Sequence, residues 1–227
     1  MSHEIHPNAP IATVDAVVFT LEDDCLKLLL HKRQKGPQEG LWALPGGFIH
    51  TDSDASADAA MRRVLGDKTG VTGLYLEQLG TYSGPNRDPR GWSLSITHLA
   101  LVPRGDLKIS NELDAELFEV SNLPELAFDH ASIINDARSR LQGKGAYSTL
   151  PTSFLGAEFT LTEMQKAYEI TLGTRLNQSS FRRKVLDIGI IEDTGRTSQE
   201  GNARPAKVYK LKSGARTFDR TLGQSVA

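Results

Sequence analysis

The sequence predicts two domains: a mixed α/β domain and, after it, a smaller winged helix-turn-helix domain. Three observations predict this organisation. At roughly 150 residues per domain, the 227 residues leave room for one medium domain and a small appendage. Strand and helix patterns mix in the first part of the chain, whereas a helix, turn, helix, hairpin order closes it. Between them lies a stretch rich in glycine, proline and small polar residues, which indicates a boundary.

The charge of the chain divides near the same boundary. Lysine plus arginine total 26 and aspartate plus glutamate 28, and the formal net charge of −2 by itself argues against a nucleic-acid partner. Residues 1–150, however, hold 14 basic and 20 acidic residues, a balance of −6. Residues 151–227 hold 12 basic and 8 acidic residues, a balance of +4. The near-neutral total therefore combines an acidic body with a basic tail.

Composition excludes several classes of protein. With 39% hydrophobic and 24% charged residues, the chain has the balance of a soluble globular protein and not of a disordered one. No apolar run approaches the roughly 18 residues that span a bilayer, and the first residues lack a signal-peptide pattern. A single cysteine, Cys25, excludes an intrachain disulfide framework and a multi-cysteine zinc site. We therefore expect a cytoplasmic protein that has no membrane partner.

The first domain, residues 1–146, is expected to contain both strands and helices. Residues 12–20 and 26–33 are rich in valine and leucine and flank an acidic turn, so they predict a strand pair. Two further strands are predicted at residues 74–82 and 92–102. Two amphipathic helices are predicted at residues 55–69 and 129–142. These patterns predict an α/β domain in which helices pack on the faces of a sheet.

The predicted boundary leads into the second domain. The stretch 141–154 has three turn-forming or helix-breaking residues and no periodic apolar face, and we place the linker at residues 147–157. The second domain then covers residues 158–227. Its first helix is predicted to begin with a capping box, in which Thr160 and Glu163 satisfy backbone amides at the helix start.

Glycines are placed to end both helices of this domain. Gly173 follows the first helix, and Gly189 follows a second helix that begins at the predicted N-cap Asn177. A short apolar run from Ile190 and the alternating residues 206–211 predict two strands. Helix, turn, helix and hairpin in this order predict a winged helix-turn-helix.

The second of these helices is predicted to be a recognition helix. On a helical wheel Phe181, Val185 and Ile188 face the preceding helix, whereas short polar residues and arginines face outward. Short side chains allow close approach to DNA, and arginines reach guanine edges or phosphates. The predicted DNA-binding residues of the helix and the wing are Asn177, Ser179, Ser180, Arg182, Arg183, Lys184, Arg196, Arg204 and Lys207. The alternative is a solvated charged face, but the basic hairpin that follows the helix favours DNA.

The segment LWALPGGFIHTDSDASADAAMRRVLGDKTGV, residues 41–71, resembles the Nudix box, whose pattern is G-x5-E-x7-R-E-U-x-E-E-x-G-U with U an aliphatic residue. LPGG before the box helix, Arg63 within it and Gly70-Val71 after it all match, and the resemblance extends over most of residues 12–142. It implies a Nudix-type α/β/α sandwich. In that family clustered glutamates hold the divalent metal that polarises a pyrophosphate for attack by water.

The acidic ligands of this box are missing. Alignment on Arg63 puts Val64 at the first glutamate and Asp67 and Lys68 at the glutamate pair, so positive charge stands where a cation would bind. Gly47 and Arg63 are 16 residues apart, where the pattern requires about 14. The isolated glutamate has no counterpart, although three aspartates lie nearby: Asp52, Asp54 and Asp58. We therefore predict a Nudix domain that binds no metal and is not an enzyme.

A pocket without catalysis can still bind a ligand. The loop SGPNRDPRGW, residues 83–92, resembles a stretch of Nudix proteins that handle ADP-ribose, and arginine suits phosphates. Trp42 and Phe48 are candidates to stack a base. Core packing is the alternative for Trp42, and a surface turn is the alternative for residues 88–90. The predicted ligand-binding residues are Arg33, Trp42, Gly46, Gly47, Phe48, Arg87, Asp88 and Arg90.

A degenerate Nudix domain followed by a winged helix resembles the NrtR family of Nudix-related transcriptional regulators of NAD metabolism. FTLTEMQKAYEITLG (159–173), SFRRKVL (180–186) and ARPAKVYKL (203–211) carry this resemblance in the second domain. It implies a homodimeric repressor of NAD biosynthesis or salvage genes that binds palindromic operator DNA, with ADP-ribose as effector and no cofactor. Two alternatives stay open: an active ADP-ribose pyrophosphatase with an accessory C-terminal domain, and a protein-interaction scaffold.

Overall fold

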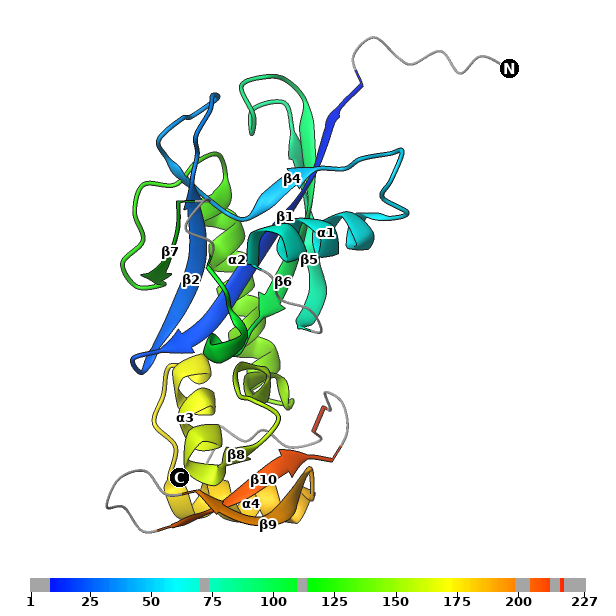
Figure 1. The fold of residues 1–227 in the computed structure, drawn as a ribbon. Helices are drawn as coiled ribbons and strands as arrows, with labels where there is room; N and C mark the ends of the chain where they lie inside the picture. The colour runs from blue at the N-terminus through cyan, green and yellow to red at the C-terminus, as the bar shows by residue number, and fades with distance from the viewer. Residues whose placement is uncertain (1–8, 70–73, 110–113, 199–204, 213–216, 219–227) are drawn as a thin grey trace. The chain divides into compact units, whose positions relative to one another are not determined.

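The structure, a computed structural model, describes residues 9–69, 74–109, 114–198, 205–212 and 217–218 (Figure 1). The chain forms two compact units. The first takes in most of the residues up to Ala137, and the second takes in the residues from Arg138 onward together with two short segments, Thr20–Leu26 and Leu101–Asp106. None of the helices in the described part of the chain combines the length and the apolar character that a membrane span requires.

A mixed sheet forms the centre of the first unit. Its strands are β1 (Ile11–Glu22), β2 (Cys25–Lys32), β3 (Trp42–Ala43), β4 (Gly46–Phe48), β5 (Tyr75–Gly84), β6 (Ser93–Leu101) and β7 (Ala115–Glu119). They run in the order β3-β2-β1-β6-β5, while β4 pairs with β1 and β7 pairs with β2. Figure 1 shows helix α1 (Ala57–Thr69) in front of the sheet and α2 (His130–Gly145) behind it. This is the predicted α/β/α arrangement.

The strand pair predicted at residues 12–20 and 26–33 is confirmed as β1 and β2. Asp23 and Asp24 connect them with φ values of 51° and 60°, the left-handed pair that a two-residue hairpin turn requires. Helix α1 begins two residues later than predicted, because the hydroxyl of Ser56 accepts a hydrogen bond from the Ala59 N–H (3.1 Å) and so caps the helix start. The apolar face of α1 is buried, as the helical spacing predicted. It consists of Ala60, Met61, Val64 and Leu65.

The second unit has the predicted winged-helix order. It contains β8 (Phe159–Thr160), α3 (Leu161–Leu172), α4 (Gln178–Ile188), β9 (Ile191–Ser198) and β10 (Ala206–Leu211), with the strand order β8-β10-β9. The capping box is formed: the Glu163 N–H donates to the Thr160 hydroxyl, and the Thr160 N–H donates to the Glu163 carboxylate. Gly173 and Gly189 end the two helices in the left-handed conformation, with φ of 67° and 69°.

The winged-helix core brings both helices onto the small sheet. Its buried members are Phe159, Met164, Tyr168, Phe181, Val185, Ile190, Ile191 and Tyr209. The rings of Tyr168 and Phe181 lie 5.5 Å apart, and the Tyr168 hydroxyl donates a 2.8 Å hydrogen bond to the Ser148 carbonyl. The helical-wheel prediction is therefore confirmed for Phe181 and Val185. It is wrong for Ile188, which lies at the last position of α4 and is 39% exposed.

Part of the segment that we interpreted as a linker is instead packed. Leu150–Phe154 forms a short 3₁₀ helix, η3, in which four of the five side chains are buried. Gly143 lies inside α2, and Gly145 is still helical as its last residue. A Cβ atom at Gly145 would lie 2.7 Å from Cγ2 of Thr171, so this glycine permits the end of α2 to approach α3 closely. The pattern was misinterpreted because a glycine that permits close packing is indistinguishable in sequence from one that forms a turn.

Candidate functional site

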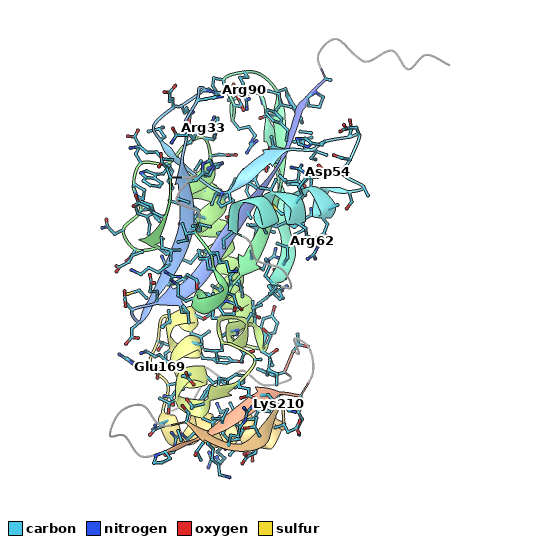
Figure 2. All side chains as sticks on the ribbon, viewed as in Figure 1. Arg33, Asp54, Arg62, Arg90, Glu169 and Lys210 are labelled. Atoms are coloured by element: carbon cyan, nitrogen blue, oxygen red, sulfur yellow. The ribbon has the colours of Figure 1, made fainter. Side chains whose placement is uncertain are left out.

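A cavity of about 220 Å³ lies in the first unit. Seven of the eight residues predicted to bind a ligand line it: Arg33, Gly46, Gly47, Phe48, Arg87, Asp88 and Arg90. Seven further residues complete the lining, and the sequence did not single them out: Thr13, Asp15, His31, Ala43, Leu44, Phe128 and His130. Figure 2 shows Arg33 and Arg90 at the same end of this unit. Segments that are far apart in the sequence thus contribute to one site.

The three arginines of the cavity are held in place by hydrogen bonds. Arg90 forms a bidentate pair with Asp88 (2.7 and 3.0 Å), and Arg87 forms one with Asp129 (2.9 and 3.0 Å). The Arg33 Nε donates to the Pro37 carbonyl at 2.9 Å. These fixed guanidinium groups present an array of donors that matches the oxygens of phosphate groups.

The electrostatics of these groups favour an anion. Burial lowers the pKa of Arg33, and the nearby positive charge of Arg90 lowers it further. Hydrogen bonds from Arg90 hold the pKa of Asp88 below its usual value, so this carboxyl stays ionised and orders the loop. Two cations that disfavour each other are stabilised when an anion binds between them. The cavity is therefore suited to a phosphorylated ligand.

Two aromatic rings of the site lie beneath arginines. The guanidinium of Arg33 is 4.7 Å from the ring centre of Phe128, and that of Arg90 is 5.5 Å from the ring centre of Phe48. Phe48 is 51% exposed, so one part of its ring remains available to stack a planar group. Trp42 does not line the cavity. Its ring packs edge-on against Phe118 at 4.6 Å, in accordance with the core-packing alternative.

Two buried polar side chains also line the cavity. Asp15, on β1, accepts a 2.5 Å hydrogen bond from the Ser95 hydroxyl, and it lies against the backbone of Gly46 on β4. His130, the first residue of α2, accepts a 3.0 Å hydrogen bond at Nδ1 from the Leu44 N–H, and burial lowers its pKa. The signal for Asp15 was present in the sequence, since it is the one charged residue inside the apolar run of β1.

The box helix offers no metal site in its described side chains. Val64, at the position of the family's first glutamate, is 4% exposed, and its Cγ2 atom would lie 3.2 Å from a Cβ at Gly47. An aliphatic group therefore occupies the space between helix and cavity wall. The helix backbone of Asp67 and Lys68 is described, but their side chains lie outside the described part of the structure.

The aspartates near the box are paired with arginines. Asp54 accepts two hydrogen bonds from Arg63 (2.7 and 2.8 Å), which together with the His50 N–H hold its pKa well below the usual value. Asp58 pairs with Arg62 at 2.9 Å. Figure 2 shows Asp54 and Arg62 beside α1. Across the described residues, no group of three His, Cys, Asp or Glu side chains is placed to hold a metal ion. Asp54 and Asp58 are thus engaged by arginines of the box region.

The candidate DNA-binding surface lies on α4 in the second unit. Ser179, Arg182 and Arg183 are exposed on it, and Ser180 and Lys184 are half-buried. Arg182 donates to the Thr162 hydroxyl at 3.5 Å. Within the described part of the chain, Arg183 has no ion-pair partner. The N-cap prediction is confirmed, since the side chain of Asn177 accepts a 3.0 Å hydrogen bond from the Ser180 N–H. Asn177 thus orients the start of this helix.

The cations of the wing strands are paired with carboxylates. Arg196 pairs with Glu158, Lys207 with Asp193 at 2.8 Å and Lys210 with Glu192 at 3.5 Å. Figure 2 labels Lys210 on β10. Arg204, which we also predicted to bind DNA, lies outside the described residues.

An exposed leucine was missed on the outward face of α4. Leu186 is 52% exposed and follows Arg183 by three residues, which places both side chains on the same face. The signal was available, because on the helical wheel Leu186 falls among the outward residues. An apolar side chain at such a position can contact the methyl group of thymine.

The turn between α3 and α4 is organised by one half-buried acid. Glu169 accepts hydrogen bonds from the Leu176 N–H (2.9 Å), from Gln165 (3.0 Å) and from Arg175 (2.9 Å). Burial alone would raise the pKa of Glu169, but these hydrogen bonds outweigh burial, and the pKa lies below its usual value. Figure 2 shows Glu169 on α3. This carboxylate fixes the turn that sets α4 against α3.

Comparison with known proteins agrees with both halves of this fold. Residues 10–137 match the family model of the NUDIX domain, and residues 151–211 match that of the NrtR DNA-binding winged helix domain. The ADPR responsive transcriptional repressor NtrR of Acinetobacter baylyi is 37% identical over 207 residues, which cover 89% of this chain and 82% of the relative. An ADP-ribose pyrophosphatase of Methanocaldococcus jannaschii is 41% identical over 128 residues, 56% of this chain and 72% of that enzyme.

Solved structures of Shewanella oneidensis NrtR are also similar. NrtR complexed with a 27mer DNA has a TM-score of 0.85 and 40% identity, and covers 92% of this chain and 98% of that chain. Its NUDIX domain complexed with ADP ribose has a TM-score of 0.54 and 41% identity, and covers 59% of this chain and 90% of that chain. The fold and the two sites define a Nudix protein with a winged-helix DNA-binding domain. The chain belongs to the NrtR family.

Proposed function

We propose that this protein is an ADP-ribose-responsive transcriptional repressor of NAD biosynthesis or salvage genes. It binds palindromic operator DNA through its winged helix as a homodimer, and ADP-ribose in the Nudix cavity releases it. The cavity is the observation that supports this proposal most directly. Three fixed arginines and two aromatic rings lie there beside a box helix that has Val64 at the position of the first glutamate of the Nudix pattern. The similarity to a repressor described as ADPR responsive supports this assignment.

Each part of the cavity has a role toward such a ligand. The guanidinium groups of Arg33, Arg87 and Arg90 bind the pyrophosphate, since arginine forks match phosphate oxygens in pairs. The exposed ring of Phe48 stacks the adenine. Asp88 holds Arg90 in the ligand-free protein, and the ligand competes with this carboxylate for the guanidinium. Binding therefore rearranges the loop that carries Asp88 and Arg90.

The cavity binds without hydrolysis. A Nudix hydrolase needs carboxylates to hold the metal that polarises the pyrophosphate, whereas here Val64 is aliphatic and Asp54 is occupied by Arg63. The alternative is an active ADP-ribose pyrophosphatase, and the likeness to the M. jannaschii enzyme favours it for the first domain. Release of AMP and ribose 5-phosphate from ADP-ribose with Mg²⁺ or Mn²⁺ is the test. We expect no turnover, and steady turnover would overturn the assignment.

The winged helix places α4 in the major groove. Arg182 and Arg183 contact bases or phosphates there, while the exposed Ser179 allows close approach. A palindromic operator requires two such helices related by a two-fold axis, which is why we propose a homodimer. No cofactor is needed for this activity, and we place the protein in the cytoplasm.

The effector acts through linked equilibria. ADP-ribose releases the operator only to the extent that it binds the DNA-free conformation more tightly than the DNA-bound one. By linkage, operator DNA weakens ADP-ribose binding by the same factor. Titration of ADP-ribose into the protein with and without operator measures both sides of this cycle.

Fluorescence anisotropy on labelled palindromic fragments from upstream of NAD genes tests the proposal. We expect specific binding that ADP-ribose reverses. Arg90→Ala should bind the operator normally and lose the ADP-ribose response, whereas the matched control Arg62→Ala, an exposed arginine outside the cavity, should keep both. Binding that ignores ADP-ribose in the wild-type protein would defeat the effector assignment.

A second pair of variants tests the DNA surface. Arg183→Ala should weaken operator binding by about 1–3 kcal/mol and relax specificity if the arginine contacts a base. Arg138→Ala removes an exposed arginine of α2 and should leave the affinity unchanged. Equal affinity of the Arg183 variant and the wild-type protein would remove Arg183 from the interface.

A further inference from the structure

Two buried polar side chains of the cavity have no role in the binding mode proposed above. Asp15 is 8% exposed and His130 is 3% exposed, yet both line the cavity beside the arginines. Burial of a carboxylate and an imidazole away from bulk water is costly unless hydrogen bonds compensate it. Each has one such bond from the protein, and each retains further hydrogen-bonding capacity.

The carboxylate of Asp15 is fixed in position. The Ser95 hydroxyl donates to Oδ2 at 2.5 Å, and the Thr97 hydroxyl lies 3.3 Å from that of Ser95. Oδ1 lies so close to Gly46 that a Cβ there would be 1.9 Å from it. A carboxylate oxygen accepts more than one hydrogen bond. Asp15 therefore offers a rigid, negatively charged acceptor at the cavity wall.

His130 supplies a complementary donor. Its Nδ1 accepts a hydrogen bond from the Leu44 N–H, so the neutral ring carries its proton on Nε2. Burial lowers the pKa of His130, which keeps the ring neutral at physiological pH. Among the described residues, the Nε2 atom has no hydrogen-bond acceptor. The N–H at Nε2 thus remains for a ligand.

This combination selects the chemistry of its ligand. A carboxylate repels a phosphate group, so Asp15 is unsuited to the pyrophosphate that the arginines take. A hydroxyl group both donates and accepts, and neighbouring hydroxyls of a sugar can donate to a carboxylate and accept from an imidazole N–H. We infer that Asp15 and His130 form a hydroxyl-binding subsite for the terminal pentose of a nucleoside diphosphate sugar. This inference rests on the proposed function and adds the basis of its selectivity.

Calorimetric titration of the full chain with two ligands tests the subsite. The ligands are ADP-ribose and the β-methyl ester of ADP, which has the same pyrophosphate charge and lacks the terminal pentose. The wild-type protein should prefer ADP-ribose about 10- to 100-fold, because a site built to bind hydroxyls rejects a ligand without them. Comparable affinity for the two ligands would overturn the subsite. This arm needs no variant, so it does not depend on the folding of one.

Substitutions assign the preference to residues. Asp15→Asn keeps the shape and removes the charge. His130→Asn retains an acceptor near Nδ1 and removes the Nε2 donor. Each variant should reduce the preference for ADP-ribose to about 3-fold or less, because a lost hydrogen bond to a charged group lowers the affinity by one to two powers of ten. The affinity of each variant for the ester should stay close to that of the wild-type protein. Glu119→Gln, on β7 and outside the cavity, should retain the full preference.

The outcomes separate the two levels of the proposal. If the wild-type protein binds neither ligand, the proposed function fails. If it binds both ligands and the preference for ADP-ribose survives both substitutions, the subsite fails and the proposed function stands. If the preference falls in the two variants and not in Glu119→Gln, both stand. The ester affinity of each variant shows that its cavity is folded.

Discussion

Substitution of Gly46 by alanine tests the packing that fixes the cavity wall. A Cβ atom at this position would lie 1.9 Å from Oδ1 of Asp15 and 2.8 Å from the carbonyl oxygen of Val14. The backbone oxygen cannot yield cheaply, so the carboxylate must move and break its 2.5 Å hydrogen bond with Ser95. Overpacking costs about 1–3 kcal/mol, and loss of a hydrogen bond to a charged group costs a similar amount. We expect Gly46→Ala to destabilise the first unit by about 2–5 kcal/mol.

The neighbouring glycine is the matched control. A Cβ at Gly47 would lie 3.2 Å from Cγ2 of Val64, the end of a side chain that can shift by a few tenths of an ångström. Gly47→Ala should therefore cost less than about 1 kcal/mol. Urea unfolding followed by tryptophan fluorescence measures both, because the two tryptophans of the chain, Trp42 and Trp92, belong to the first unit. Equal stability of the two variants would refute the reasoning.

Three further predictions concern Glu169, Tyr168 and His130. Glu169→Ala should lower the hydrogen-exchange protection of the Leu176 amide by about 1–3 kcal/mol, because it removes the acceptor of that N–H; unchanged protection would show that the carboxylate does not fix the turn. Because the folded protein lowers the pKa of Glu169 from 4.5, its contribution is present above pH 4.5 and is lost as the pH falls through the folded value. Tyr168→Phe should destabilise the winged helix by about 1 kcal/mol in thermal melts, since the bond to the Ser148 carbonyl disappears while the ring remains. Burial lowers the pKa of His130 from 6.5, so the first unit should be fully stable above pH 6.5 and lose stability as the pH falls below it. In urea unfolding His130→Asn should flatten that pH dependence, and the same slope in both proteins would contradict it.

The long elements were predictable because each one shows its periodicity over several turns or residue pairs. α4 is an example: Asn177, Phe181, Val185 and Gly189 mark its start, its buried face and its end. β3 and β4 have only two and three residues, and no pattern can be recognised over that length. Ile188 was misassigned because a helical wheel shows the direction of a side chain and does not show whether a partner covers it at the last position of the helix.

The candidate site was predictable where the residue type alone implies its chemistry. Arginine suits phosphate oxygens, and Arg33, Arg87 and Arg90 do line one cavity. Asp15 and His130 were missed because a buried acid on a strand and a histidine at a helix start more often serve packing than binding. The antiparallel pairing of Asp15 with Gly46, which the sequence does not reveal, brings this residue to the cavity wall.

The ion pairs of the wing bear on how operator binding responds to salt. When a phosphate takes a lysine or arginine, it releases a condensed counterion, and the logarithm of the affinity falls by about 0.9 per contact with the logarithm of the salt concentration. The cations of Lys207 and Lys210 already neutralise carboxylates of the same sheet, and Arg196 neutralises Glu158, which directly precedes β8. A carboxylate left behind takes up a cation from solution and offsets that release. The salt dependence of the affinity for operator DNA should therefore reflect mainly the phosphate contacts of α4. The contacts of the wing should add affinity that persists at high ionic strength.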